Sequence, residues 1–153
     1  MNIIHIHLIT VHIPVLFVPL GTILLGLGLT RENPTLRQTG YSLMIIGAFF
    51  GSIAYLSGEE IESSIRAIIP GSRSPIHAHE EAAEVAFTLS YIGAFLATCS
   101  IGSRYIKYHK LECILGIITL IIGLVSTTTL GYAAYKGGQI RHTEIHATSY
   151  AQD

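Results

Sequence analysis

Charge is scarce in this chain of 153 residues, in which Asp, Glu, Lys and Arg together make up 12%. A soluble domain carries about 25% charged residues, because it must cover its surface with groups that water hydrates. Half of the residues are apolar, and the mean hydropathy is +0.52. The composition therefore excludes an ordinary soluble globule and favours an integral membrane protein.

Several motifs that would indicate a particular chemistry are also absent. The chain has no glycine-rich phosphate loop, no GxSxG elbow and no CxxCH motif, so the usual covalent attachment of a c-type haem is excluded. The formal net charge of -1 argues against a nucleic-acid partner, which would favour a basic stripe. Cys99 and Cys113 are too few for a disulfide framework, and we expect both to be small apolar helix residues.

Four apolar stretches approach the length of about 20 residues that a helix needs to cross the hydrocarbon core. None contains Asp, Glu, Lys or Arg, except for Glu84 near the start of the third. The first has no basic region and no small-residue cleavage site before Arg31, so we interpret it as a retained helix and not as a signal peptide. With their polar ends included, the expected helices cover residues 8–29, 40–56, 76–101 and 111–135.

Turn and capping residues separate these helices. Residues 31–34, Arg-Glu-Asn-Pro, should end the first helix, and Ser57-Gly58 should end the second. The longest loop is expected between the second and third helices, and residues 59–69 within it could form a short amphipathic surface helix. The sequence thus predicts a single all-α domain over residues 1–153, an integral membrane four-helix bundle that runs up-down-up-down.

This topology places both termini and the longest loop on one side of the membrane and two short links on the other. We call these the histidine side and the link side. The link side is denser in cations and nearly free of carboxylates, so the positive-inside rule places it in the cytoplasm and both termini in the periplasm. The cations are Arg31, Arg37, Arg104, Lys107 and Lys110 on the link side and Arg66, Arg73, Lys136 and Arg141 on the histidine side.

All but one of the 8 histidines fall on the histidine side, and the exception is His109. Their segments are far apart in the sequence, so antiparallel packing is what would bring them together. A four-helix bundle with inward-pointing imidazoles from several helices is a standard way to hold a metal or a cofactor. The seven are His5, His7 and His12 in the first helix, His77 and His79 in the third, and His142 and His146 after the fourth.

Each histidine also has a purely structural interpretation. His5, His77 and His146 fit solvated residues at the membrane interface. His12 lies inside the first apolar run, where a polar group is costly without a partner. For His12 we therefore favour a functional role over a simple hydrogen bond to a backbone carbonyl.

An acidic stripe begins the third helix. Ser74-Pro75 predicts an N-cap and a first helical residue, which places His79 in the first turn. The stripe could be a carboxylate-rich metal or proton site, but glutamates in a first turn also complement the helix dipole, and we favour that role for its first two glutamates. Glu84 lies deep enough to need a partner, such as Arg141 or Lys136. The stripe consists of His77, Glu80, Glu81 and Glu84.

Both ends of the chain resemble a known family. Residues 7–14, His-Leu-Ile-Thr-Val-His-Ile-Pro, resemble the HPxxVHFPIA opening of DUF2231, a family of small bacterial four-helix membrane proteins of undetermined function. Residues 137–145 resemble that family's closing segment, GGxIRHxEI, and His79-Glu80 is similar to its central histidine. The resemblance spans the whole chain. Leu8 replaces the family's proline and Ile13 its phenylalanine, and neither departure removes a candidate ligand.

The resemblance implies a cofactor, because the family is similar to the two-haem cytochrome b561-like membrane proteins. We accordingly expect non-covalent haem b and electron transfer in the bacterial inner membrane, with quinol or a redox subunit as partner; homo-oligomerisation stays open. His12 and His79 are the preferred axial pair. His7 and His142 are the second choice, for a second haem or as hydrogen-bonding residues behind the ligands. Arg141 would pair with a haem propionate.

Two other functions stay open on the residues alone. The same imidazoles, together with Glu84, could bind a zinc, copper or iron ion in a protein that senses or stores metal. Alternatively, the chain is a structural subunit of a membrane complex, and its histidines have no ligand. No catalytic residue is assigned, so enzymatic activity is left undecided.

Overall fold

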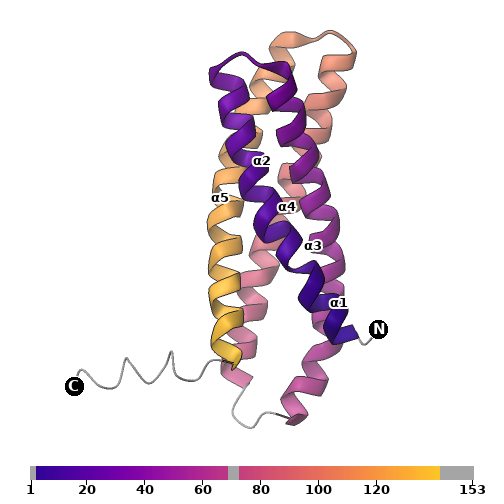
Figure 1. The fold of residues 1–153 in the computed structure, drawn as a ribbon, viewed down its shortest axis with the longest axis vertical. Helices are drawn as coiled ribbons and strands as arrows, with labels where there is room; N and C mark the ends of the chain where they lie inside the picture. Colours follow the sequence, from indigo (N-terminus) through magenta and orange to yellow (C-terminus); the bar gives the residue numbers. More distant parts are fainter. Residues whose placement is uncertain (1–2, 69–72, 142–153) are drawn as a thin grey trace, which may run out of the picture.

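The computed structural model describes the backbone of residues 3–68 and 73–141 and the side chains of residues 3–61 and 76–139. These described residues are all helical apart from short links, as predicted (Figure 1). Four segments are long and apolar enough to cross a membrane: Ile3–Thr30, Pro34–Ile61, Ile76–Tyr105 and His109–Gln139. The helices are α1 (Ile3–Thr10), α2 (His12–Thr30), α3 (Pro34–Ile68), α4 (Arg73–Tyr105) and α5 (His109–Arg141).

A single residue, Val11, separates α1 from α2, so the two form one interrupted rod. Pro14 explains the interruption, because proline has no N–H to donate and its ring collides with the carbonyl of the residue four positions earlier, here Thr10. Val11 itself keeps helical dihedral angles, with φ −62° and ψ −29°. As a result α1 packs on α3, whereas α2 packs on both α3 and α5 (Figure 1).

The second expected helix is longer than predicted. Ser57-Gly58 does not end it, and α3 continues to Ile68, so the expected surface helix over 59–69 is largely the end of α3. A lone glycine costs a helix only about 1 kcal/mol, which packing can offset. Similarly, α4 begins at Arg73, so Ser74 lies inside the helix and not before it.

Both links on the link side end their helices in the same way. The N–H of Asn33 bonds to the carbonyl five residues earlier at 2.9 Å, and the N–H of Tyr108 does the same at 2.9 Å. This Schellman arrangement places the preceding residue in the left-handed region, where glycine is usual. Here Glu32 has φ 52° and Lys107 has φ 61°. The side chain of Asn33 then caps α3, accepting the N–H groups of Thr35 and Leu36 at 3.0 and 3.1 Å.

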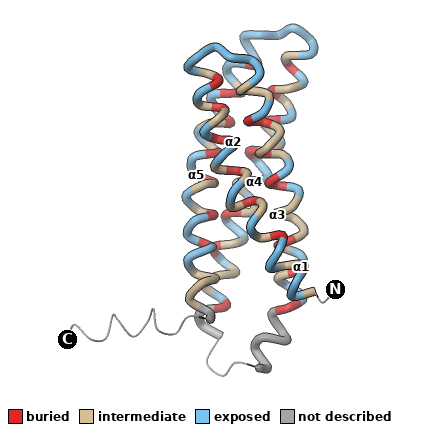
Figure 2. Tube along the Cα trace, viewed as in Figure 1, coloured by how far each residue is buried: buried red, intermediate tan, exposed pale blue. Residues whose placement is uncertain are grey.

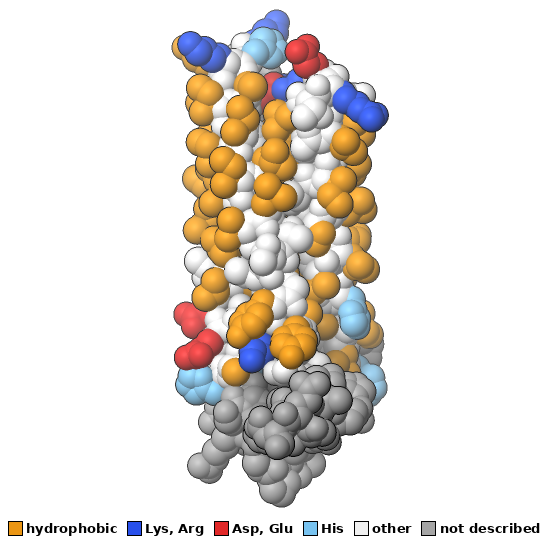
Figure 3. Space-filling model, turned by 90° about the vertical axis from the view of Figure 1, so that its left-hand side faces the viewer, with side chains coloured by type: hydrophobic (Ala, Val, Ile, Leu, Met, Phe, Trp, Pro, Cys, Tyr) orange, Lys and Arg blue, Asp and Glu red, His pale blue; other side chains and the backbone are white. Residues whose placement is uncertain are grey.

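Glycines allow the helices to approach closely. A Cβ built on Gly21 of α2 would lie 2.7 Å from the carbonyl oxygen of Gly40 of α3, and the reverse contact is also 2.7 Å. Buried residues line the inner faces of the helices, and exposed residues lie outside (Figure 2). Many of the exposed residues are large and apolar, including Leu16, Phe49 and Phe95, each more than 60% exposed, as expected for a surface in contact with lipid (Figure 3).

Candidate functional site

His7, on α1, reaches across to α3. Its Nδ1 lies 2.8 Å from the backbone carbonyl oxygen of Ala54. A carbonyl can only accept, so Nδ1 carries the proton and donates it, which in the neutral ring leaves the lone pair on Nε2. The hydroxyl of Ser57 donates to the same carbonyl at 3.0 Å. The structure thereby fixes both the orientation and the tautomer of this imidazole.

His79, on α4, does the same toward α5. Its Nδ1 lies 2.9 Å from the carbonyl oxygen of Ala133, and the same reasoning places the proton on Nδ1 and the free lone pair on Nε2. An Nδ1–H donated to a backbone carbonyl is the usual support behind an imidazole that binds metal through Nε2.

A glycine lies beside each imidazole, four residues after the alanine that accepts its hydrogen bond. A Cβ on Gly58 would lie 3.0 Å from Cε1 of His7, and a Cβ on Gly137 would lie 3.1 Å from Cε1 of His79. In a helix the carbonyl of residue i points toward residue i+4. A glycine at i+4 therefore leaves the carbonyl of Ala54 or Ala133 accessible to a ring from another helix. The two sites share this Ala-x-x-x-Gly design, although they lie on different helix pairs.

The other histidine-side candidates lie elsewhere. His12 and Glu84 are both exposed, so the expected inward partner of His12 is not found among the described residues. The candidates His142 and His146 lie outside the described residues, and the side chain of Arg141 is not described.

The acidic stripe of α4 contributes an exposed pair, not a buried site. The imidazole of His77 lies 3.5 Å from the carboxylate of Glu81, and both side chains are well exposed. Among the residues whose side chains are described, no three His, Cys, Asp or Glu side chains converge in a group that could hold a metal ion. The histidine side thus offers two supported imidazoles and no larger ligand set in its described part.

The link side holds a buried carboxylate that sequence analysis did not identify. The Glu112 side chain of α5 is only 3% exposed, and its Oε1 lies 3.3 Å from Arg37 of α3 and 3.5 Å from Arg104 of α4. His109, with 77% of its side chain exposed, lies 3.8 Å from the other carboxylate oxygen. The carboxylate therefore joins three helices. In the sequence, Glu112 could have been recognised as an acidic residue at the start of an apolar helix, on the side of the membrane that is rich in cations.

The sequence did not single out Ala54, Gly58 and Ala133 either, because alanines and glycines are common in packed membrane helices. The signal that could have found them is the pair of Ala-x-x-x-Gly spacings, at 54–58 and 133–137, on the side where the histidines gather. Neither spacing identifies which imidazole it receives, since that depends on how the helices pack.

One comparison with known proteins gives a match. The family model described as "Predicted membrane protein (DUF2231)" matches residues 4–148, which include His7, His79 and Glu112. No curated protein and no solved structure matches the chain.

Proposed function

The chain belongs to the DUF2231 family of membrane proteins, and we propose that it binds haem b through His7 and His79 and serves in electron transfer. The observation that carries the proposal is the common support of the two imidazoles. Each donates Nδ1–H to a helix carbonyl, at 2.8 and 2.9 Å, and keeps its Nε2 lone pair for a ligand. Bound haem would supply an iron that changes its oxidation state by one electron.

The residues present fit this group better than they fit a bare metal ion. Haem iron takes one or two protein imidazoles, whereas zinc is normally held by three or four protein ligands. The described residues provide two supported imidazoles and no group of three. Gly58 and Gly137 add no side chain beside Cε1 of either ring, so no Cβ crowds either imidazole from that position.

The chain's own contribution would be to hold the two rings and set their basicity. A backbone carbonyl that accepts Nδ1–H raises the basicity of the ligating nitrogen and keeps the ring from rotating. We propose His7 in place of His12 as the partner of His79, because His12 is exposed on α2 and no described residue supports its imidazole. Arg141 and His142 stay predictions, as partners of a propionate or of a second haem.

We further propose that the link side faces the cytoplasm and that the termini are periplasmic in a bacterial inner membrane, with quinol or a redox subunit as electron partner. The links and the helix ends beside them carry Arg31, Arg104, Lys107 and Lys110, and the positive-inside rule places such a side in the cytoplasm. A reporter fused after Asp153 should be active if it needs the periplasm and inactive if it needs the cytoplasm. The reverse result would invert the orientation.

An absorption spectrum of the detergent-purified protein, oxidised and then reduced with dithionite, tests the cofactor. We expect a Soret band and sharpened visible bands on reduction. His7→Ala and His79→Ala should each lower the bound haem at least tenfold, because each removes an iron ligand. Both variants should still insert, since alanine is more apolar than histidine.

Two control variants make the outcome decisive. His109 lies on the opposite side, about 30 Å away across the hydrocarbon core, so the His109→Ala variant should keep the full spectrum. His12→Ala should also keep it. If His12→Ala loses haem and His7→Ala does not, our assignment of His7 as a haem ligand is wrong. A colourless protein that carries zinc or copper after expression with ample haem would favour an ion site, and a protein with neither would favour a structural subunit.

A further inference from the structure

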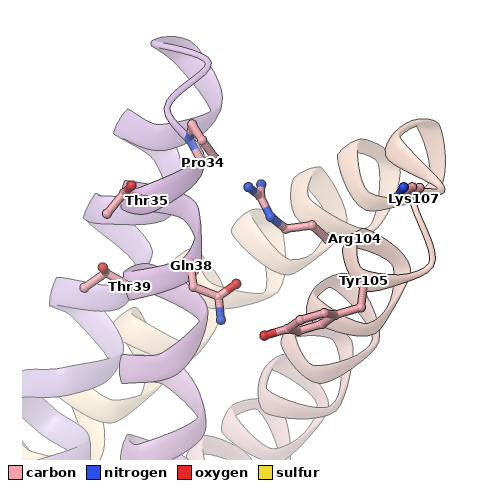
Figure 4. Close-up of a pocket in the computed structure, with 7 residues that line it drawn as sticks. All are labelled: Pro34, Thr35, Gln38, Thr39, Arg104, Tyr105 and Lys107. Atoms are coloured by element: carbon pink, nitrogen blue, oxygen red, sulfur yellow. The ribbon is translucent and has the colours of Figure 1, made fainter.

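A pocket of about 470 Å³ lies on the link side, where the first turns of α3 face the last turn of α4 (Figure 4). Its size falls within the range of about 300–1,000 Å³ that is usual for small-ligand sites. The guanidinium of Arg104 projects into the space between the two helices, and the amide of Gln38 and the hydroxyl of Tyr105 point toward the same space (Figure 4). Lys107 lies at its rim (Figure 4).

The pocket is rich in hydrogen-bond donors, and no carboxylate is among its lining residues. Guanidinium, ammonium, amide and phenol groups can all donate to an anion, and a guanidinium matches phosphate oxygens with two parallel hydrogen bonds. Thr35 and Thr39 also line the pocket, on the same turns of α3. The lining therefore favours a ligand that is anionic and has several acceptor oxygens.

Positive charge at this place is not fully neutralised within the surrounding cluster. Arg37 and Arg104 share one carboxylate, Glu112, at 3.3 and 3.5 Å. Two guanidinium groups against one carboxylate leave one positive charge, and Lys107 adds another. An incoming anion would thus balance charge that the ion pairs leave over.

The position of the pocket points to a lipid as the source of that anion. Tyr105 is 80% exposed, as is common for tyrosine at the headgroup level of a membrane. Further along the same two helices, Ile46 and Phe49 of α3 and Ile92 and Phe95 of α4 are exposed apolar side chains that acyl chains could cover. We propose that the pocket binds the phosphate of an anionic phospholipid headgroup.

The full-length protein can be tested in nanodiscs made of phosphatidylcholine with a tenth of phosphatidylglycerol. Native mass spectrometry after mild delipidation counts the lipids retained by each protein. We expect selective retention of phosphatidylglycerol. Lys107→Gln should reduce this retention about fivefold, because a cation near an anionic lipid contributes about that factor. The Lys110→Gln variant removes a cation from the first turn of α5, outside the pocket lining, and it should retain phosphatidylglycerol as the wild type does.

A second variant separates binding from folding. Arg104→Gln could destabilise the fold through Glu112, so Lys107→Gly is the better choice. It removes the charge and also relieves the left-handed backbone at φ 61°, so thermal stability should rise while phosphatidylglycerol retention falls.

Three results would overturn the proposal. The first is equal retention of the two lipids. The second is an equal loss in Lys110→Gln, which would indicate general surface electrostatics. The third is displacement of phosphatidylglycerol by millimolar inorganic phosphate that itself raises thermal stability, which would indicate a site for free phosphate and not for a lipid.

Discussion

The two ends of the bundle bury polar groups in opposite ways. On the histidine side, two imidazoles each donate to a single backbone carbonyl, from Ala54 or Ala133, and each keeps an unused lone pair. On the link side, the carboxylate of Glu112 is held by two guanidinium groups from other helices. The buried polar groups are paired with neutral groups at one end of the bundle and with charged groups at the other.

This difference teaches what each end can do. A neutral imidazole with a fixed tautomer costs little to bury and is ready to bind metal through Nε2. A buried carboxylate is costly unless its charge is matched, so Glu112 depends on its cations and ties α3, α4 and α5 together. We therefore expect substitutions on the link side to affect folding and substitutions on the histidine side to affect ligand binding.

The largest effect is expected from Glu112→Gln. It leaves Arg37 without a charge partner in a largely buried position, so the free energy of unfolding should fall by about 3 kcal/mol. Denaturant unfolding in detergent micelles, followed by circular dichroism, measures this change. Glu32→Gln is the matched control on the same side, where the side chain is exposed, and should change stability by less than about 0.5 kcal/mol. Equal stability of the two variants would contradict an anchoring role for Glu112.

A smaller effect, on binding, is expected from Gly137→Ala. The new Cβ would meet Cε1 of His79 at 3.1 Å, so the ring must shift and its bond to Ala133 must lengthen. Haem content should fall about tenfold, equivalent to about 1.4 kcal/mol, while the helical content stays the same. Gly138→Ala is the control, because a Cβ there meets nothing within 4 Å. If both variants kept all their haem, the glycine would not be needed to position the ring.

The smallest effect is a gain in stability from Glu32→Gly on the link side. Glu32 has φ 52°, a conformation that glycine adopts without the steric cost of a Cβ. The free energy of unfolding should rise by about 0.5–1 kcal/mol. Glu60→Gly, in an exposed position within α3, should instead lower it by about 1 kcal/mol. A loss in both variants would mean that the Glu32 side chain makes a stabilising interaction that outweighs the backbone strain.

Sequence alone determined the membrane class, the helical bundle and the gathering of histidines on one side. These follow from composition and from apolar length, which are properties of each segment by itself. The interruption of the first helix at Val11 was not predicted, although the effect of Pro14 on the carbonyl of Thr10 is local. The predicted end of the second helix was wrong. Ser57-Gly58 has the composition of a helix end, but Gly58 packs against His7 of α1 and lies inside α3.

The tertiary structure decided which histidines have support and which do not. His7 and His12 lie five positions apart, about 140° around a helix, so at most one of them can face a given neighbour. Their shared apolar surroundings could not indicate which one. Only the packing of α1 on α3 brings His7 to the carbonyl of Ala54, and only the packing of α4 on α5 brings His79 to Ala133. The burial of Glu112 was likewise decided by the tertiary structure, because its partners Arg37 and Arg104 lie on other helices, α3 and α4. The fold sets the distances between helices, and the sequence of one segment does not give them.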